Sequence, residues 1–169
     1  MRFTTNRLYI STFQRTDPFY VIDVSNPNSI KILGNLVLEG FSRFLYVFVD
    51  NIILSFGRAD GQRNAAPQLT LFNVEDPTNP KINANITIAS GNEKLLSSAE
   101  FDHKALLISK TKNLVSLPLR NKNFGFNGAF MFYVDRNLIE LKEGGQINHL
   151  PSSYDKFNDY TVQRSFIVE

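Results

Sequence analysis

The sequence predicts an all-β chain that is built from a repeated unit. The stretch YVIDVSNPNSIKILG at residues 20–34 returns at residues 70–83 as TLFNVEDPTNPKIN. Each copy holds a short apolar strand, an Asn-Pro or Asp-Pro turn, and a Lys-Ile pair that opens a new strand. The chain also contains 15 Phe and 6 Tyr, residue types that favour strands. Short strands that repeat every 40 to 50 residues, roughly, indicate a β-propeller. Two chance strand–turn–strand units in a β-sandwich are the alternative.

The two copies place similar side chains on the same face of a strand, because side chains alternate with period two. The pairs Asn26-Pro27 and Asp76-Pro77 then end the strand, since proline has no N–H and the Asn or Asp side chain can close a turn. We expect these turns to join the outer strand of one blade to the inner strand of the next. A weaker echo, FYVD at residues 132–135, lacks the proline. The predicted core residues at equivalent places are Ile22, Val24, Phe72, Val74, Phe132 and Val134.

The other strands are apolar runs between turn signals. The predicted strands are residues 7–13, 19–24, 30–38, 44–49, 52–56, 69–74, 82–89, 100–110, 113–119, 128–134, 138–142 and 160–168. Residues 16–18 are expected to form a turn, Gly34 to mark a bulge, and Gly144-Gly145 to break the chain. Residues 91–100 alone have some helical character. This pattern predicts one partial propeller domain over residues 1–169, with three blades and part of a fourth, and hence an incomplete ring.

Composition excludes several classes of function. The net charge is only +2 and the Lys and Arg residues are scattered, which argues against a nucleic-acid partner. The chain has no Cys and two His, so we expect no disulfide, no transition-metal site and no cofactor. The start, MRFTTNRLYI, lacks the apolar core of a signal peptide, and Asp50 and Asn51 interrupt the most apolar run. No membrane insertion is therefore expected. A Gly-x-Ser-x-Gly motif is absent, and no catalytic residue is predicted.

An ordered set of segments resembles a known family. The segments are LYISTF, DPFYVIDVSNPNSIKILG, GFSRFLYVF, ILSFGRADG, LTLFNVEDPTNPK, FDHKALL, GAFMFYVD and VQRSFIV. Their order over nearly the whole chain is similar to that of the secreted β-propeller C-terminal domain family of bacteria and archaea. The full domains of that family are longer and usually follow an export signal. The resemblance implies a propeller fold, an extracellular or cell-surface location for the full-length protein, and a binding role.

Two groups of polar residues are candidates for binding. The longest polar loop, residues 57–64, carries Arg58, Asp60 and Arg63, and binding residues concentrate in loops on a rigid scaffold. A solvated turn is the alternative for this loop. Asp102-His103, close to Glu100, is the densest acidic-and-His group, expected on one strand. A structural role that ties a tight turn to a neighbouring strand is favoured for this pair over a general base or metal ligand.

Two functions remain open at this point. The first is a non-catalytic propeller that binds an unknown protein or glycan, or serves as a scaffold. The alternative is a propeller-type hydrolase that acts on a glycan or lactone. Carboxylates and histidines converging on the central channel would favour the hydrolase. The one dense acidic-and-His group, at residues 100–103, is expected on a single strand, and this favours binding. An open ring also exposes apolar faces and unpaired edges. We therefore expect the chain to self-associate, to aggregate or to need further sequence to fold well.

Overall fold

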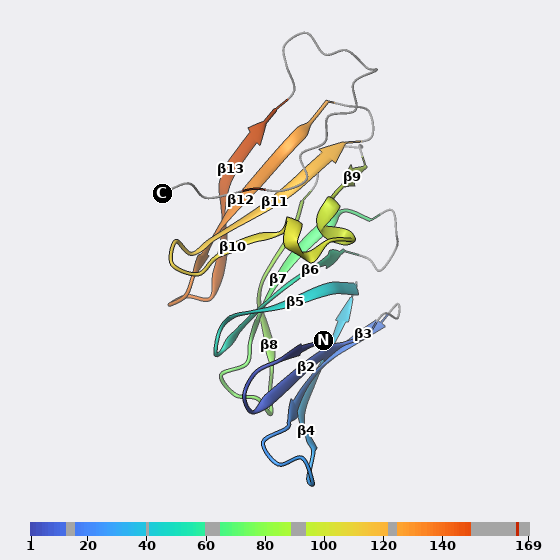
Figure 1. The fold of residues 1–169 in the computed structure, drawn as a ribbon, viewed down its shortest axis with the longest axis vertical. Helices are drawn as coiled ribbons and strands as arrows, with labels where there is room; N and C mark the ends of the chain where they lie inside the picture. Colours follow the sequence, from blue (N-terminus) through green and yellow to red (C-terminus); the bar gives the residue numbers. More distant parts are fainter. Residues whose placement is uncertain are drawn as a thin grey trace. The chain divides into compact units, whose positions relative to one another are not determined.

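The strands that the structure describes form three antiparallel sheets (Figure 1). The structure is a computed structural model, and it describes residues 1–12, 16–39, 41–59, 65–88, 94–121, 125–149 and 165. In this part of the chain the strands of each sheet pair mainly in chain order, and none of the three sheets closes on itself. The all-β prediction is therefore confirmed.

Two four-stranded sheets lie in one compact unit, formed by Met1–Ile88 and Arg136–Glu140. The strands of the first sheet are β1 (Arg2–Phe3), β2 (Arg7–Ser11), β3 (Thr16–Asp23) and β4 (Lys31–Glu39). The strands of the second sheet are β5 (Phe41–Val49), β6 (Ile52–Arg58), β7 (Pro67–Asn73) and β8 (Lys81–Thr87).

The third sheet lies in the other compact unit, formed by Ala89–Asp135 and Leu141–Glu169. Its elements are β9 (Leu95–Leu96), the 3-10 helices η1 (Ser98–Glu100) and η2 (His103–Ala105), β10 (Leu107–Ser109), β11 (Leu114–Asn121), β12 (Asn127–Asp135) and β13 (Glu140–Asn148). Strand β11 pairs with β10 and with β9, so the first strand position of this sheet is divided between two short strands.

Residues at equivalent positions of the repeat pair in the same way in each of the three sheets. The backbone N–H of Val24, Val74 and Val134 donates to the carbonyl of an Asn before the second strand of its sheet, at 3.0, 2.9 and 2.8 Å. The neighbouring apolar pairs also correspond, as Leu8–Ile22, Ile53–Phe72 and Val115–Phe132. The three echoes found in the sequence therefore occupy equivalent places in successive sheets.

The same irregularity recurs in the first two sheets. Between β3 and β4, Val21 pairs with Gly34 and Ile22 with Ile32, so Leu33 is an extra residue. Between β7 and β8 the extra residue is Asn83, because Leu71 pairs with Ala84 and Phe72 with Ile82. The predicted bulge thus exists, one residue before Gly34. A bulge increases the local twist of a strand pair and so bends the fourth strand of each sheet.

The Asn-Pro and Asp-Pro turns lie within single sheets. The turn at Asn26-Pro27 joins β3 to β4, and the turn at Asp76-Pro77 joins β7 to β8. The prediction that they connect successive blades was wrong. Lys31 pairs back with Asp23 and Lys81 with Asn73, so each turn closes a hairpin. The boundary between the first two blades lies between β4 and β5.

Three strand assignments from sequence need correction. Residues 16–18 belong to β3 and do not form a turn. Pro18 is tolerated there because β2 ends opposite Phe19, so β3 has only β4 as a neighbour at that point. Strand β13 continues through Gly144 and Gly145 because it is an edge strand and can absorb the positive φ of 114° at Gly145. The predicted strand at 100–110 is replaced largely by η1 and η2.

The predicted strand at residues 160–168 lies outside the described residues except for Ser165. The hydroxyl of that residue is 3.0 Å from the hydroxyl of Ser116 in β11. This contact links Ser165 to the third sheet.

A core of aromatic and aliphatic side chains joins the first sheet to the second. The rings of Tyr9 and Phe19 stack with centroids 6.1 Å apart, and Phe19 stacks on Phe72 at 4.4 Å. The other buried members of this core are Val21, Leu45, Ile53 and Val74. Of the six predicted core residues, Phe72, Val74, Phe132 and Val134 are buried, whereas Ile22 and Val24 are partly exposed. The difference arises because the second sheet packs on the opposite face of the first.

Replacing Phe72 by Ala should lower the free energy of unfolding by about 3 to 5 kcal/mol, because the ring is fully buried and stacked. Phe101→Ala is the control, since Phe101 is exposed and its loss should change the free energy by about 0.5 kcal/mol or less. Chemical denaturation measures both. Equal losses in the two variants would contradict the packing of the first two sheets.

Replacing Gly34 by Ala should cost about 1 to 3 kcal/mol through overpacking. A Cβ at this position would lie 2.6 Å from the carbonyl oxygens of Pro77 and Thr78, in the turn of the second sheet. Ala84 holds the equivalent place in the second sheet, so Ala84→Gly is the matched control, with an expected loss of about 1 kcal/mol or less. A Gly34→Ala chain as stable as the wild type would rule out this contact.

Candidate functional site

A capped 3-10 turn follows β9 in the third sheet. The hydroxyl of Ser97 accepts a hydrogen bond from the Ala99 N–H at 3.2 Å and donates to the Pro118 carbonyl at 2.6 Å. The carboxylate of Glu100 accepts from the Ser97 N–H at 3.4 Å. Together these bonds make a capping box, in which two otherwise unpaired N–H groups at the start of η1 are satisfied. The turn is thereby attached to β11.

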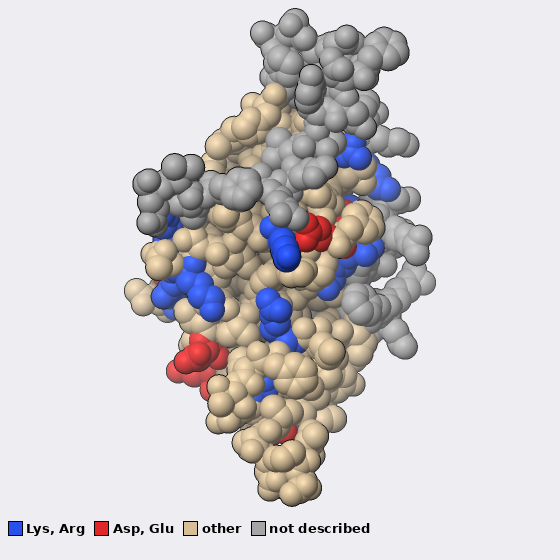
Figure 2. Space-filling model, in the orientation of Figure 1, with Lys and Arg blue, Asp and Glu red and all other residues tan. Residues whose placement is uncertain are grey.

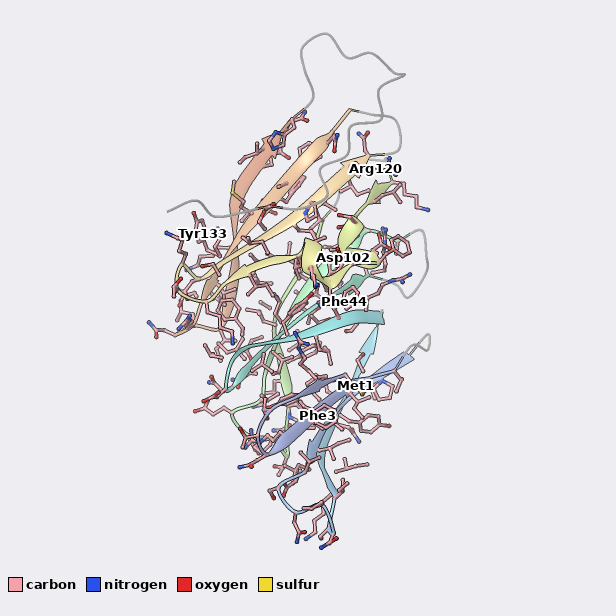
Figure 3. All side chains as sticks on the ribbon, in the orientation of Figure 1. Met1, Phe3, Phe44, Asp102, Arg120 and Tyr133 are labelled. Atoms are coloured by element: carbon pink, nitrogen blue, oxygen red, sulfur yellow. The ribbon has the colours of Figure 1, made fainter. Side chains whose placement is uncertain are left out.

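A second capped turn follows directly. The carboxylate of Asp102 accepts from the Lys104 N–H at 2.9 Å, and the Asp102 carbonyl accepts from the Ala105 N–H at 3.0 Å. The Asp102 N–H in turn donates to the Ser98 carbonyl at 3.0 Å, which links η2 to η1. Residues 97–106 therefore form one continuous hydrogen-bonded segment, which we call the double turn. Figure 3 labels Asp102 within it.

The double turn has a buried side and an exposed side. Ala99, Ala105 and Leu106 are buried and fix it to the third sheet. Phe101 is 82% exposed, and His103 and Lys104 are also exposed. An aromatic ring, an imidazole and an ammonium group are thus presented to solvent on a backbone whose conformation is held by two caps. Such an element can contact a ligand at a low cost in conformational entropy.

The structure places Asp102 and His103 differently from the single strand expected. They lie at the start of η2, where Asp102 is the N-cap and His103 the first residue. Glu100 belongs to η1 and is buried in its capping box. The three residues therefore follow one another on two turns, and the carboxylates of Asp102 and Glu100 each hold a turn together. The assignment of Asp102 and His103 to a binding site stays a prediction.

Arg58 lies inside the first unit. It is the last residue of β6 and is only 1% exposed, so the polar loop begins after it and not at Gly57. Its guanidinium donates to the Ala65 carbonyl, and the Ala59 N–H donates to the Ala66 carbonyl at 3.0 Å. These bonds hold the two ends of the loop together. Asp60 and Arg63 lie outside the described residues, and their predicted role in binding is not tested.

The two proline turns have matching hydrogen bonds with exchanged residue types. In the first turn the Asp23 carboxylate accepts from the Ser25 N–H and the Asn26 side chain accepts from the Asn28 N–H, at 2.9 and 3.0 Å. In the second turn Asn73 and Asp76 take these places, and they accept from Glu75 and Thr78 at the same distances of 2.9 and 3.0 Å. Each turn therefore contains one carboxylate and one amide as caps.

Hydrogen bonding lowers the pKa of both carboxylates in these turns. The Ser25 hydroxyl and N–H lower the pKa of Asp23 below its usual 3.8. The Thr78 hydroxyl, 2.7 Å from the Asp76 carboxylate, and the Thr78 N–H do the same for the pKa of Asp76. Both side chains are at the surface, and their charge favours the closed turn.

No group of three or more His, Cys, Asp or Glu side chains able to hold a metal ion occurs among the residues that the structure describes. In the same part of the chain, no helix is both long enough and apolar enough to span a membrane.

Sequence reasoning missed the double turn, although its signals were present. Ser97-Ser98-Ala99-Glu100 matches the Ser-x-x-Glu pattern of a capping box, and Asp102 is a favoured N-cap residue. The alternation of apolar residues in FDHKALLISK dominated the interpretation and favoured a strand. The same alternation places Phe101 in a strand, and the exposure of its ring does not follow from the sequence pattern.

Comparison of the sequence with known proteins assigns the chain to a family. The family model described as beta propeller domain matches residues 1–169. An uncharacterised protein of Archaeoglobus fulgidus is 33% identical over 148 residues, which is 87% of this chain and 22% of that protein. An uncharacterised protein of Methanocaldococcus jannaschii is 31% identical over 141 residues, which is 83% of this chain and 21% of that protein. The chain thus spans about a fifth of the length of these curated relatives.

The pH dependence of stability tests the two carboxylate caps. Because their pKa values are lowered on folding, ionised Asp23 and Asp76 stabilise the folded chain above pH 3.8, and this contribution disappears as the pH falls through the lower folded values. The double variant Asp23→Asn, Asp76→Asn keeps the acceptors and should lose less stability than the wild type on acidification. Denaturant titrations across this acid range measure the difference.

Asp76→Ala is the control for these titrations. It removes the carboxylate that accepts from Thr78, so it should destabilise the turn at every pH above 3.8. An unchanged acid dependence in the double Asn variant would show that the two carboxylates do not link stability to pH.

Proposed function

The chain belongs to the beta propeller domain family, and from this premise we propose that it is a non-catalytic binding or scaffold module of an extracellular or cell-surface protein. The ligand class is a protein or a glycan. The extracellular setting rests on the resemblance of the ordered segments to a secreted family. A propeller fold hosts many functions, so the binding role has to be argued from a particular site.

The observation that carries the proposal is the double turn, because it interrupts the repeat. In the second sheet the first strand is the single strand β5, which pairs with β6 from Phe41 to Val49 with two register shifts. In the third sheet the same position is divided into β9 and β10, with residues 97–106 between them. Insertions into a repeat often mark its binding face, since the repeat itself is needed for packing.

The chemistry of the double turn suits recognition. Exposed aromatic side chains are enriched where protein interfaces gain most of their binding energy. Phe101 supplies such a ring, with His103 and Lys104 beside it as hydrogen-bonding groups. The capping bonds of Ser97 and Asp102 fix the backbone before a ligand arrives. Little ordering is then needed on binding, which favours affinity.

A screen with two probe libraries tests the proposal. The purified chain is applied to a glycan array and to a phage-displayed random-peptide library, and each ligand found is titrated against the variant Phe101→Ala, His103→Ala. Binding should weaken about tenfold or more in this variant, as for the loss of an interface anchor. Phe3→Ala is the matched control, because Phe3 is also an exposed ring but lies in the first sheet.

The result that would overturn the proposal is binding that the double variant retains and Phe3→Ala loses, or no ligand in either library. Turnover of fluorogenic glycosides or lactones by the wild-type chain would favour the hydrolase alternative instead. Circular dichroism of each variant confirms that a loss of binding is not a loss of fold.

A further inference from the structure

Strand β8 contains an acceptor motif for N-linked glycans. The motif is Asn-x-Ser or Asn-x-Thr, where x is not proline, and Asn85-Ile86-Thr87 is the only place in the sequence that fits it. The carboxamide nitrogen of the Asn receives the sugar, and the hydroxyl two residues later is part of the signal. Short motifs also occur by chance, so the position of these residues in the fold decides whether a glycan could be carried there.

The structure places the motif at the surface of the second sheet. In the described part of the chain, β8 is the last strand of that sheet and pairs with β7 alone. Asn85 lies opposite Thr70. Thr87 lies opposite Gln68, two positions along, so the two side chains of the motif leave the same face. Both Asn85 and Thr87 are exposed, whereas Ile86 between them is only partly exposed and points to the other face.

The polar groups of the motif take little part in holding β8 in place. The Gln68 Nε2 donates to the Thr87 Oγ1 at 3.2 Å, in an exposed hydrogen bond. Within the described residues, no hydrogen bond joins the Asn85 carboxamide to another residue. A sugar on the Asn85 nitrogen would therefore break no contact of the fold. Strand β8 can pair with β7 when the glycan is already present.

The edge formed by β8 has few charges to protect it from other strands. The unpaired N–H and C=O groups of an edge strand attract further strands, and charged side chains commonly prevent such pairing. Strand β8 has one charged residue, Lys81 at its first position, whereas β4 has two and β13 has three. The surface over β1–β4 in Figure 2, in the same unit, is also mostly uncharged. A bulky, hydrated group within β8 would supply the protection that charge does not.

We propose that Asn85 carries an N-linked glycan in the mature protein, an inference that rests on the proposed extracellular setting. The donor is an oligosaccharide that is joined through C1 of its first sugar to a lipid phosphate. The Asn85 nitrogen forms a bond to C1, the bond between C1 and the phosphate oxygen breaks, and the lipid phosphate leaves with that electron pair. One amide proton passes to a base of the transferase. The step belongs to export, before β8 pairs with β7, because a paired strand cannot bend into the site of an enzyme.

Protein isolated from the cells that make it provides the first test. Trypsin cleaves after Lys81 and Lys94 and so releases residues 82–94 as one peptide. The mass of this peptide should be raised by that of an oligosaccharide, and fragmentation should place the addition on Asn85. A peptide found only at its unmodified mass would overturn the proposal.

Protease treatment of intact cells separates this failure from a failure of the proposed function. If the protein is cut from outside and Asn85 is unmodified, the extracellular setting stands and the glycan is wrong. If the protein is protected and Asn85 is unmodified, both are wrong.

Variants test whether the motif itself directs the modification. The chain is secreted behind an export signal from a eukaryotic host, and its intact mass is measured. Asn85→Gln and Thr87→Ala should each lose the glycan, whereas Thr87→Ser should keep it because the hydroxyl remains. Asn83→Gln is the matched control, because Asn83 is an exposed amide of the same strand outside the motif, and this variant should keep the glycan.

A secreted wild-type chain without a glycan would overturn the proposal, and so would loss of the glycan in Asn83→Gln. Circular dichroism of the glycosylated wild type and of the Asn85→Gln chain should coincide, because the glycan breaks no contact of the fold. A glycosylated chain that is unfolded would show that β8 cannot carry the group, and this too would exclude the proposal.

Discussion

The stack of Tyr9, Phe19 and Phe72 is the contact on which the first unit depends. Each sheet has two faces, and a meander of four strands cannot cover either of them by itself. The first sheet covers one face of the second through this stack, and it leaves its own other face uncovered. The burial of Phe72, the partial exposure of Ile22 at the equivalent place, and the exposure of Phe3 and Ile32 all follow from that single arrangement.

The repeat made much of this fold predictable from sequence. The period-two alternation and the proline turns located most strands, and the equivalence of Val24, Val74 and Val134 was visible without a structure. That the proline turns lie within single sheets follows from the pairing of Lys31 with Asp23, and this pairing cannot be read from a local sequence pattern. The burial of Arg58 could not be inferred either, because a guanidinium in a polar sequence is normally exposed.

In the double turn, helix-capping side chains outweigh the apolar alternation that favours a strand. Apolar alternation favoured a strand at residues 100–110, but three side-chain caps from Ser97, Glu100 and Asp102 stabilise turns there. Each cap satisfies an N–H that a strand would have paired with a neighbour. The segment can therefore leave the ladder without unpaired backbone groups, and the sheet resumes at β10. This substitution of caps for a ladder gives the third sheet its distinct surface.

The close approach of Gly34 to the turn at Pro77 and Thr78 limits where sheets of such chains can be exchanged with one another. If the first sheet were moved into another chain, it would bring β4 and Gly34. It would not bring the turn at Pro77 and Thr78, which belongs to the second sheet and lies against Gly34. An exchange point between Leu33 and Gly34 would separate the glycine from the bulge next to it. Exchanges between β4 and β5 keep strand, bulge and glycine together, and the incoming neighbour then needs only a compact turn at the matching place. The absence of a Cβ at position 34 therefore limits how sheets of this repeat can be combined in design.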